Sequence, residues 1–329
     1  GTILGSSNVS GDVTIPESYH GLEITAIGDH AFSGSGIPSI HLPNSLISIG
    51  EAAFQGCSSL ASPLLPNSLT SIGHTAFISC TAIETIVLPT HLKELGYNAF
   101  ADCSSLKQIT FPDGLARIEG GTFQFCTSLE TVELPSKLIF LGGSCFEYCS
   151  SLKTVKLPEG LVRIPSRAFY YCNNLTSVTV PASAAQIAFD AFLTDGGFPP
   201  SSLTFYGKAG SYAETYAKVL NIKFQSGSAP APAPTPGGGG HGGGGGSSDV
   251  PDVVPPETDA SPAVTEETAS DGSVKTTTVW ADRSQAVKVR KPSGDVSVTL
   301  AAADGAVKAA VELPGAPPAA KPFADVAEN

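Results

Sequence analysis

The sequence predicts a solenoid, in which short parallel strands stack coil upon coil, and three observations lead to this prediction. The segments FQFCTSLETVELP and FEYCSSLKTVKLP, 23 residues apart, are nearly identical. Alignment of the chain on itself at this period puts seven phenylalanines in one column, Phe54 to Phe192, and seven prolines in another, Pro43 to Pro181. A third column holds only Ile and Leu. Repeats of this length bury their apolar residues by stacking on their neighbours.

Each unit reads as a strand followed by a return segment. The stretch T-V-E-L-P alternates inward and outward residues, and its proline cannot donate to a further ladder bond, so the strand ends there. The next stretch, L-x-x-I-G-x-x-A-F, carries regularly spaced apolar residues and a glycine where the chain must turn. A period of roughly 20 to 29 residues with one short strand per unit is typical of a leucine-rich-repeat solenoid.

The full unit, L-P-x-x-L-x-x-I-G-x-x-A-F-x-x-C-x-x-L-x-x-V-x, resembles the bacterial BspA-type leucine-rich repeat over about residues 12–224. Residues 13–32 are similar to the opening unit of that family, and residues 202–224 to its closing unit. Ser211 and Glu214 are spaced as a capping box, and Tyr212, Tyr216 and Val219 are placed to share one helix face. A helix is therefore expected to cover the last coil.

Composition divides the chain into four parts. Residues 1–227 form the repeat domain with a cap at each end, and residues 228–270, rich in Ala-Pro, Gly and acids, predict a disordered linker. Residues 271–315 alternate apolar and polar residues between turn signals, which predicts a small β-meander around Trp280. Residues 316–329 are a second linker, in which residues 323–326, Phe-Ala-Asp-Val, resemble the opening of an S-layer homology repeat. That resemblance implies a cell-wall anchor after the C-terminus shown.

The cysteines predict a column of buried free thiols. Six of them recur at the repeat period, and Cys145 stands where other units have alanine. Equivalent side chains of stacked coils run parallel, whereas a disulfide needs two Cβ atoms facing each other about 3.8 Å apart. A zinc site needs four converging ligands, and the chain has neither a C-x₂-C nor an H-x₃-H pair. We therefore expect structural thiols, with no metal or other cofactor.

Charge and motifs exclude several functions. The net charge of −12 comes without a Lys/Arg cluster, so neither nucleic acid nor an anionic membrane surface is an expected partner. There is no apolar run long enough for membrane insertion. The histidines fall at different repeat positions, no column combines Ser, His and Asp, and no G-x-S-x-G occurs, so we expect no enzymatic activity.

The outward residues of the strands form one candidate binding surface, the strand columns. Solenoids commonly bind partners on such a continuous face. A solvated sheet face is the alternative, because threonine suits exposed strands in any case. The first column comprises Thr85, Gln108, Thr131, Thr154 and Ser177, and the second includes Thr110, Glu133, Lys156 and Thr179.

The turn position before the column cysteine gives a second candidate, the aromatic strip, defined as Phe125, Tyr148, Tyr170 and Tyr171. Earlier units hold Gly, Ser or Asp at this position. Coils about 4.8 Å apart would align the rings on the return side. Exposed aromatic rings in a row favour a partner-binding surface. The alternative is that the rings cover the coil edge or only stack on one another.

The family resemblance implies a bacterial adhesin that binds a host extracellular-matrix or cell-surface protein or glycan. It further implies an extracellular, cell-wall-associated location, with attachment to a cell-wall polymer through a region outside the residues shown. Because the sequence has no Met, we expect a processed form or a fragment whose signal peptide and anchor lie elsewhere. The alternatives are a structural spacer or surface-layer component without a specific ligand, and the targeting part of a larger surface enzyme.

Overall fold

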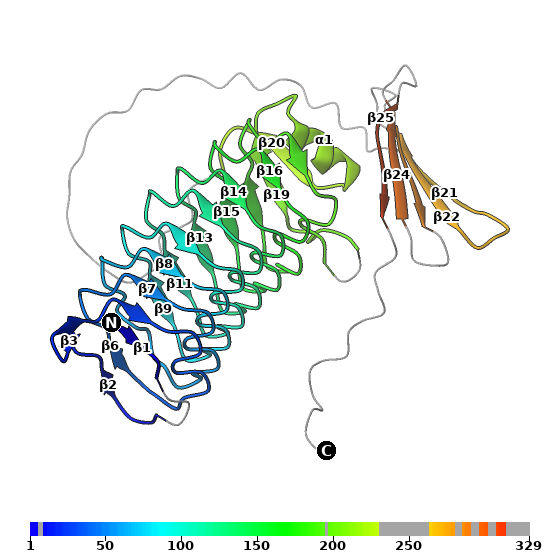
Figure 1. The fold of residues 1–329 in the computed structure, drawn as a ribbon. Helices are drawn as coiled ribbons and strands as arrows, with labels where there is room; N and C mark the ends of the chain where they lie inside the picture. Colours follow the sequence, from blue (N-terminus) through cyan, green and yellow to red (C-terminus); the bar gives the residue numbers. More distant parts are fainter. Residues whose placement is uncertain are drawn as a thin grey trace, which may run out of the picture. The chain divides into compact units, whose positions relative to one another are not determined.

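The computed structural model describes residues 1–5, 9–194, 197–229, 263–279, 285–290, 296–301 and 307–313. The chain forms two compact units, Gly1–Pro234 and Thr235–Asn329 (Figure 1). Most of the predicted linker, residues 230–262, lies outside the described residues, and so do Trp280 and the predicted second linker with its S-layer-like motif.

The first unit is the predicted leucine-rich-repeat solenoid, with parallel strands on two opposite sides of each coil (Figure 1). We name these sides the front face and the back face. The front-face strands are β2 (Val13–Thr14), β6 (Ile40–His41), β9 (Thr85–Val87), β11 (Gln108–Thr110), β13 (Thr131–Glu133), β15 (Thr154–Lys156), β17 (Ser177–Thr179), β19 (Thr204–Gly207) and β20 (Lys223–Ser226). The back-face strands are β1 (Thr2–Ile3), β5 (Ala26–Ile27), β7 (Ser48–Ile49), β8 (Ser71–Ile72), β10 (Glu94–Leu95), β12 (Arg117–Ile118), β14 (Phe140–Leu141), β16 (Arg163–Ile164) and β18 (Gln186–Ile187).

One repeat lacks the front strand that the neighbouring repeats have. Residues 62–64 form no strand, because Pro63 has no N–H to contribute to a ladder. The Ser62 hydroxyl replaces the missing pairing and accepts hydrogen bonds from the backbone N–H groups of Glu84 and Thr85, at 3.3 and 3.0 Å.

Both faces are interrupted at the same coil interface, which we name the seam. On the front face β11 and β13 belong to different hydrogen-bonded sheets, and on the back face β10 and β12 do. Glu119 explains the seam, because it occupies a position held by glycine in neighbouring coils. A Cβ atom on Gly73 or Gly96 would lie within 2.8 Å of the backbone of the preceding coil, so the Glu119 side chain does not fit at that spacing.

The core is a ladder of phenylalanine rings that runs the length of the solenoid. Adjacent centroids lie 5.0 to 5.8 Å apart with ring planes within 11°, and the widest spacing, between Phe100 and Phe123, falls at the seam. Each stacked pair contributes about 0.5–1.5 kcal/mol beyond its buried area. The ladder consists of Phe32, Phe54, Phe77, Phe100, Phe123, Phe146, Phe169 and Phe192.

The prediction of buried free thiols is confirmed. All seven cysteines are buried and unpaired. The six of the repeat column each donate from Sγ to the carbonyl oxygen of a phenylalanine in the preceding coil, at 3.0 to 3.3 Å. Burial raises the pKa of Cys57 to about 11, and it raises the pKa values of the six other thiols further.

The predicted helical cap is helix α1 (Tyr212–Val219). The Ser211 hydroxyl accepts from the N–H of Glu214 at 3.4 Å, and the Glu214 carboxylate accepts from the N–H of Gly210 at 2.6 Å. The predicted shared face was wrong in part, because Tyr212 is exposed while Ala213, Tyr216 and Ala217 are buried. Tyr216 closes the aromatic ladder, since its ring stacks on Phe205 and its hydroxyl donates to a backbone carbonyl.

Two further sheets are antiparallel. A hairpin of β3 (Ser18–Tyr19) and β4 (Leu22–Glu23) lies near the N-terminus. The second unit contains a five-stranded antiparallel meander, so the sequence prediction of a meander agrees with this sheet. Its first strand lies inside the predicted linker 228–270, because Ala-Val-Thr-Glu-Glu-Thr alternates as a strand does. Its strands are β21 (Ala263–Thr268), β22 (Val274–Val279), β23 (Gln285–Arg290), β24 (Val296–Ala301) and β25 (Val307–Leu313).

Candidate binding surfaces

The aromatic strip is built on a backbone turn in the left-handed conformation. Phe125, Tyr148 and Tyr171 have φ angles of 62°, 62° and 61°, and the preceding coils have Gly56, Ser79 and Asp102 in the same region. Each of these residues donates its N–H to a carbonyl of the following coil, at 2.7 to 2.9 Å. The repeat therefore imposes this conformation, which costs a bulky side chain about 1 kcal/mol or more.

The structure brings the four predicted rings of the aromatic strip together. Tyr148 lies between the other two turn residues, with ring centroids 4.7 Å from Phe125 and 4.3 Å from Tyr171, and both pairs are stacked. Tyr170 packs edge-on against Tyr171 at 4.8 Å. The strip runs along the turns that join the back strands to the next front strands, and the Phe125 side chain is 40% exposed.

A polar layer supports the aromatic strip from the side. The buried carboxylate of Glu147 accepts from Gln124 at 2.9 Å and forms an ion pair with Arg167 at 3.4 Å. The Arg167 guanidinium also lies 5.1 Å from the centre of the Tyr170 ring. Because these contacts fix Tyr170, the strip has a defined shape before any partner binds.

The stacking determines what the aromatic strip can offer a ligand. Both faces of the Tyr148 ring are covered by neighbouring rings, so only its edge and hydroxyl point outward. A sugar ring binds best on an open aromatic face, whereas protein side chains pack readily on ring edges and bond to tyrosine hydroxyls. The geometry of the strip is therefore better suited to a protein surface than to a glycan.

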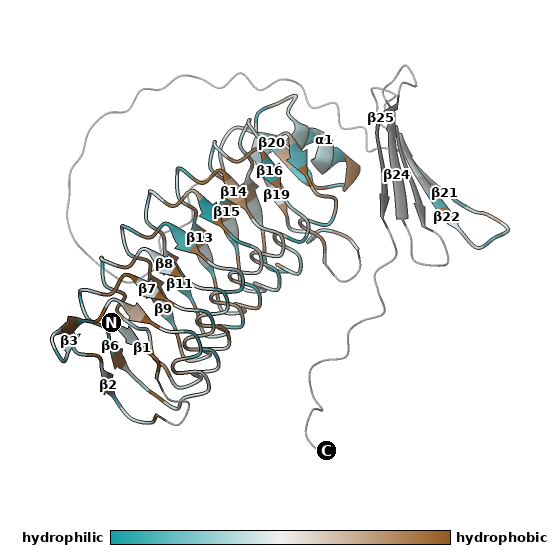
Figure 2. Cartoon of the chain, viewed as in Figure 1, coloured by the Kyte–Doolittle hydropathy of each residue, from teal (hydrophilic) through white to brown (hydrophobic). Residues whose placement is uncertain are grey.

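The second strand column is only partly continuous. Glu133, Lys156 and Thr179 are direct neighbours in register on β13, β15 and β17. Thr110 lies across the seam on β11, and a hollow of about 230 Å³ opens there between the two strands. Thr179 is half-buried and accepts a hydrogen bond from the N–H of Ala229, so the chain itself covers part of this column. Figure 2 shows the polar residues of β13 and β15 in teal.

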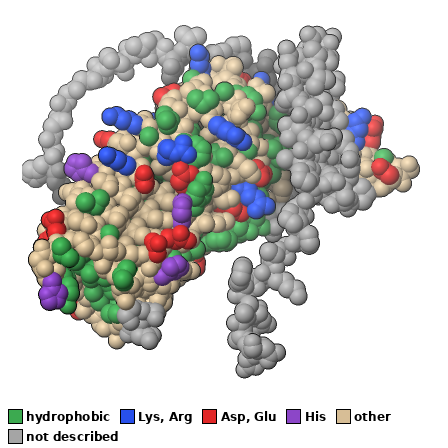
Figure 3. All heavy atoms as spheres, viewed as in Figure 1, with side chains coloured by type: hydrophobic (Ala, Val, Ile, Leu, Met, Phe, Trp, Pro, Cys, Tyr) green, Lys and Arg blue, Asp and Glu red, His purple; other side chains and the backbone are tan. Residues whose placement is uncertain are grey.

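Charges on the front face alternate rather than accumulate. Lys107 pairs with Glu84 at 2.8 Å and Lys153 with Glu130 at 2.7 Å, each from neighbouring coils. The hydrogen bond from Lys153 lowers the pKa of Glu130. Figure 3 shows Lys and Arg side chains interspersed with Asp and Glu on the visible face of the repeat unit. This surface has no field of a single sign that would attract a strongly charged partner.

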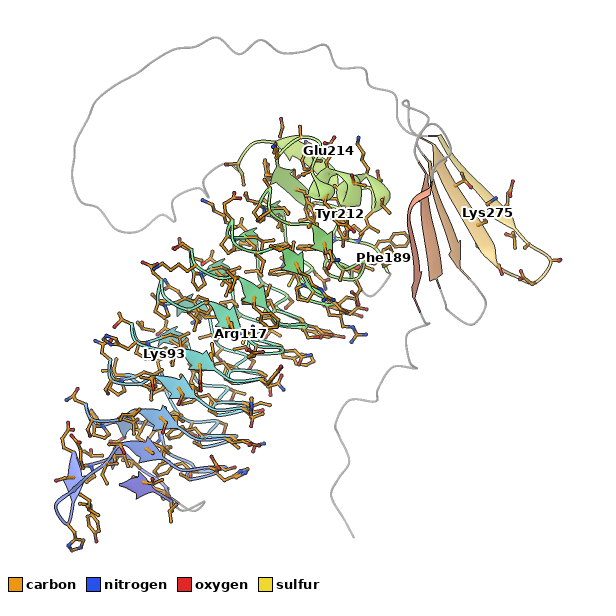
Figure 4. The ribbon with its side chains drawn as sticks, turned by 45° about the horizontal axis from the view of Figure 1, so that its top comes forward. Lys93, Arg117, Phe189, Tyr212, Glu214 and Lys275 are labelled. Atoms are coloured by element: carbon orange, nitrogen blue, oxygen red, sulfur yellow. The ribbon has the colours of Figure 1, made fainter. Side chains whose placement is uncertain are left out.

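Sequence reasoning missed a groove on the back face. A hollow of about 560 Å³ extends over β7, β8 and β10 and ends at the seam, where Arg117 and Glu119 form its wall. Tyr97 and His74 line one side, and Lys93 also borders the groove. Figure 4 shows Lys93 and Arg117 on neighbouring coils. The signal was present in the sequence, because Glu119 interrupts a column of glycines, but its effect depends on the distance between coils.

The described residues contain neither a metal-binding cluster nor a membrane-spanning helix. Among them no group of three or more His, Cys, Asp and Glu side chains is placed to hold a metal ion. No helix in the same part of the chain has the length and apolar character needed to cross a membrane.

Comparison with known proteins identifies the class. The BspA type leucine-rich repeat region matches in six copies, over residues 12–119 and 70–195, which together exceed half of the chain. The chain therefore belongs to the BspA-type leucine-rich repeat family. No curated protein matches the chain.

Solved structures with the same kind of repeat resemble the chain at low identity. A leucine-rich repeat protein of T. pallidum is 24% identical, with a TM-score of 0.42, and the match covers 67% of this chain and 86% of the other. A leucine-rich cell surface protein of Faecalibacterium prausnitzii is 22% identical, with a TM-score of 0.38, and the shares are 59% and 68%. A leucine-rich repeat protein of Bacteroides ovatus is 21% identical, with a TM-score of 0.29, and the shares are 67% and 94%.

Proposed function

We propose that this chain is a non-enzymatic binding module on the surface of a bacterium and that it adheres to a host extracellular-matrix or cell-surface protein. The aromatic strip is the proposed contact, and the continuous part of the strand columns, Glu133 and Lys156, is the second choice. Membership of the BspA-type repeat family supports a surface module of this kind. Attachment to a cell-wall polymer is assigned to a region outside these residues.

One observation carries the proposal. Three consecutive coils place a large aromatic residue at a left-handed turn position where glycine would relieve the backbone. The rings gain stacking energy there, but they also leave Phe125 two-fifths exposed. A partner that buries the outer edges of the strip would recover apolar contact that the free chain lacks, at about 25 cal/mol per Å².

The test is a binding measurement on the full chain. The wild type and a Phe125→Ser, Tyr148→Ser, Tyr171→Ser triple variant are applied to immobilised matrix proteins, mucins and bacterial glycans. Both proteins must first give the same circular dichroism spectrum and similar melting temperatures. A specific interaction with a protein ligand that the triple variant loses is the expected result.

The other results discriminate between the alternatives. Binding that the triple variant retains would move the contact to the strand columns, and a Glu133→Ala, Lys156→Ala variant would then have to lose it. No binding by either protein would contradict adhesion to the ligands tested and favour a structural spacer.

A further inference from the structure

The back-face groove has the dimensions and lining of a ligand site that is separate from the aromatic strip. Its floor consists of small residues, Ser48, Ser71 and the glycines that follow each back strand. Its volume of about 560 Å³ lies within the range of roughly 300–1,000 Å³ found for small-molecule sites. The groove ends at the seam because Glu119 replaces the next glycine of the floor.

Tyr97 provides an open aromatic face at the edge of this groove. Its side chain is 51% exposed, and the His74 ring lies 5.3 Å away on one side, tilted by 38°. On the other side the next coil has Gly120, whose φ lies outside the left-handed region that requires glycine. A Cβ atom there would lie 3.4 Å from two atoms of the Tyr97 ring, so a side chain at residue 120 would cover that face. The following coil also has glycine, Gly143, at this position. One side of the Tyr97 ring thus has no side chain from residue 120 against it, whereas both faces of the Tyr148 ring are covered.

Hydrogen-bonding groups converge on the end of the groove nearest Tyr97. Arg117 binds Glu119 Oε1 from both Nε and a terminal guanidinium nitrogen, each at 3.1 Å, and it stacks on Phe140 with 3.8 Å between its Cζ and the ring centre. These contacts hold the Glu119 carboxylate in place. Its second oxygen, Oε2, is buried and accepts no hydrogen bond from any described residue. Because Oε2 is buried, a ligand in the groove meets Arg117 instead, whose side chain is 53% exposed.

We propose that the groove binds a neutral oligosaccharide, with one sugar ring stacked on Tyr97 and one sugar hydroxyl accepting a hydrogen bond from the Arg117 guanidinium. The serine hydroxyls of the floor and the side chains of Lys93 and Glu94 then bond to further hydroxyls.

The charges of the groove favour a neutral ligand over a charged one. Two cations, Lys93 and Arg117, and two carboxylates, Glu94 and Glu119, line the groove, so the lining has no net charge to attract an anion or a cation. Mixed donors and acceptors beside an aromatic ring match a polyhydroxylated ring, which has an apolar face and hydroxyls at its rim. An apolar peptide side chain would desolvate Lys93 and Arg117 without offering them an acceptor, which argues against a hydrophobic peptide in this groove.

The experiment is ligand-observed saturation-transfer NMR on the full chain with maltohexaose, cellohexaose, mannohexaose and chitohexaose. We expect saturation transfer to at least one of them. Tyr97→Ala should weaken that binding about tenfold, because an aromatic contact of about 1.4 kcal/mol is lost. Glu119→Gln should weaken it about fivefold, because Arg117 loses the charged partner that positions it.

Matched controls separate this site from the rest of the molecule. Tyr19→Ala removes a tyrosine that is 64% exposed in the N-terminal hairpin, outside the groove, and should leave sugar binding unchanged. The triple variant of the aromatic strip should also retain it, so failure of the adhesion proposal and failure of this one are distinguishable. The inference is overturned if none of the four sugars shows saturation transfer, or if Tyr97→Ala binds as the wild type does.

Discussion

The thiol column predicts that the protein loses stability steeply in mild alkali. Burial raises the pKa of each of the seven thiols in the folded chain, to about 11 for Cys57 and higher for the others. In the unfolded chain a thiol ionises near pH 8.5. The unfolded state therefore loses protons first as the pH rises. The stabilising effect of the neutral thiols is complete below pH 8.5 and decreases as the pH climbs toward the folded-state pKa.

The magnitude follows from proton linkage. Between pH 8.5 and 9.5, ionisation lowers the free energy of the unfolded state by about 1 kcal/mol for each thiol that stays neutral in the folded state. Seven buried thiols give a total of about 7 kcal/mol, comparable to the whole stability of many domains. The measurement is guanidinium unfolding followed by circular dichroism at the two pH values, with a non-thiol reductant present.

Cys145→Ala is the matched control for this prediction. Ala53, Ala76 and Ala168 occupy the equivalent position in other coils, so the substitution fits the repeat. The variant should lose about 1 kcal/mol less than the wild type between pH 8.5 and 9.5. A decrease of less than about 2 kcal/mol in the wild type would refute the reasoning, because the thiols would then ionise in the folded chain or be exposed already.

Three further predictions concern stability. Phe100→Ala should lower the free energy of unfolding in guanidinium by about 3–5 kcal/mol, since it leaves a cavity in the phenylalanine ladder. Phe125→Ser, at an exposed residue, should lower it by less than about 1 kcal/mol. Equal losses would contradict the assignment of Phe125 to the surface. Ser211→Ala should lower stability by about 1 kcal/mol, because α1 loses its N-terminal cap, and an unchanged melting curve would show that the cap contributes nothing. Glu119→Gly should raise the melting temperature, because it removes the buried oxygen Oε2, whose missing hydrogen bond costs about 1–3 kcal/mol, and lets the coils close. A lower melting temperature would show that Glu119 does not destabilise the seam.

The sequence predicts the repeat features that every coil shares. The 23-residue period placed the phenylalanine ladder, the thiol column and the aromatic strip correctly, because equivalent residues of stacked coils must align. The pair Ser211 and Glu214 likewise located the helical cap. These features depend on residue spacing alone, so the sequence was sufficient for them.

Other features depend on distances that spacing does not provide. The back-face strands are two residues long, too short for an alternating pattern to stand out. Glu119 is visible in a glycine column, but only the close approach of neighbouring coils shows that it opens the seam and shapes the groove. The direction of the aromatic rings follows from φ angles near 62°. The sequence therefore allowed stacked rings as one alternative, but it could not show whether the rings stack on one another or cover the coil edge.

The coil-to-coil hydrogen bonds through the left-handed turns also bear on how such a protein changes over generations. Each coil presents nearly the same surface to the coil before it and to the coil after it. Unequal recombination between segments as alike as residues 123–135 and 146–158 would therefore add or delete one whole coil without disturbing the others. Duplication at that point would add one ring to the aromatic strip, while the groove near Tyr97 and the helical cap would stay intact. Variation in coil number is thus a route by which contact area with a partner grows in single, equal steps.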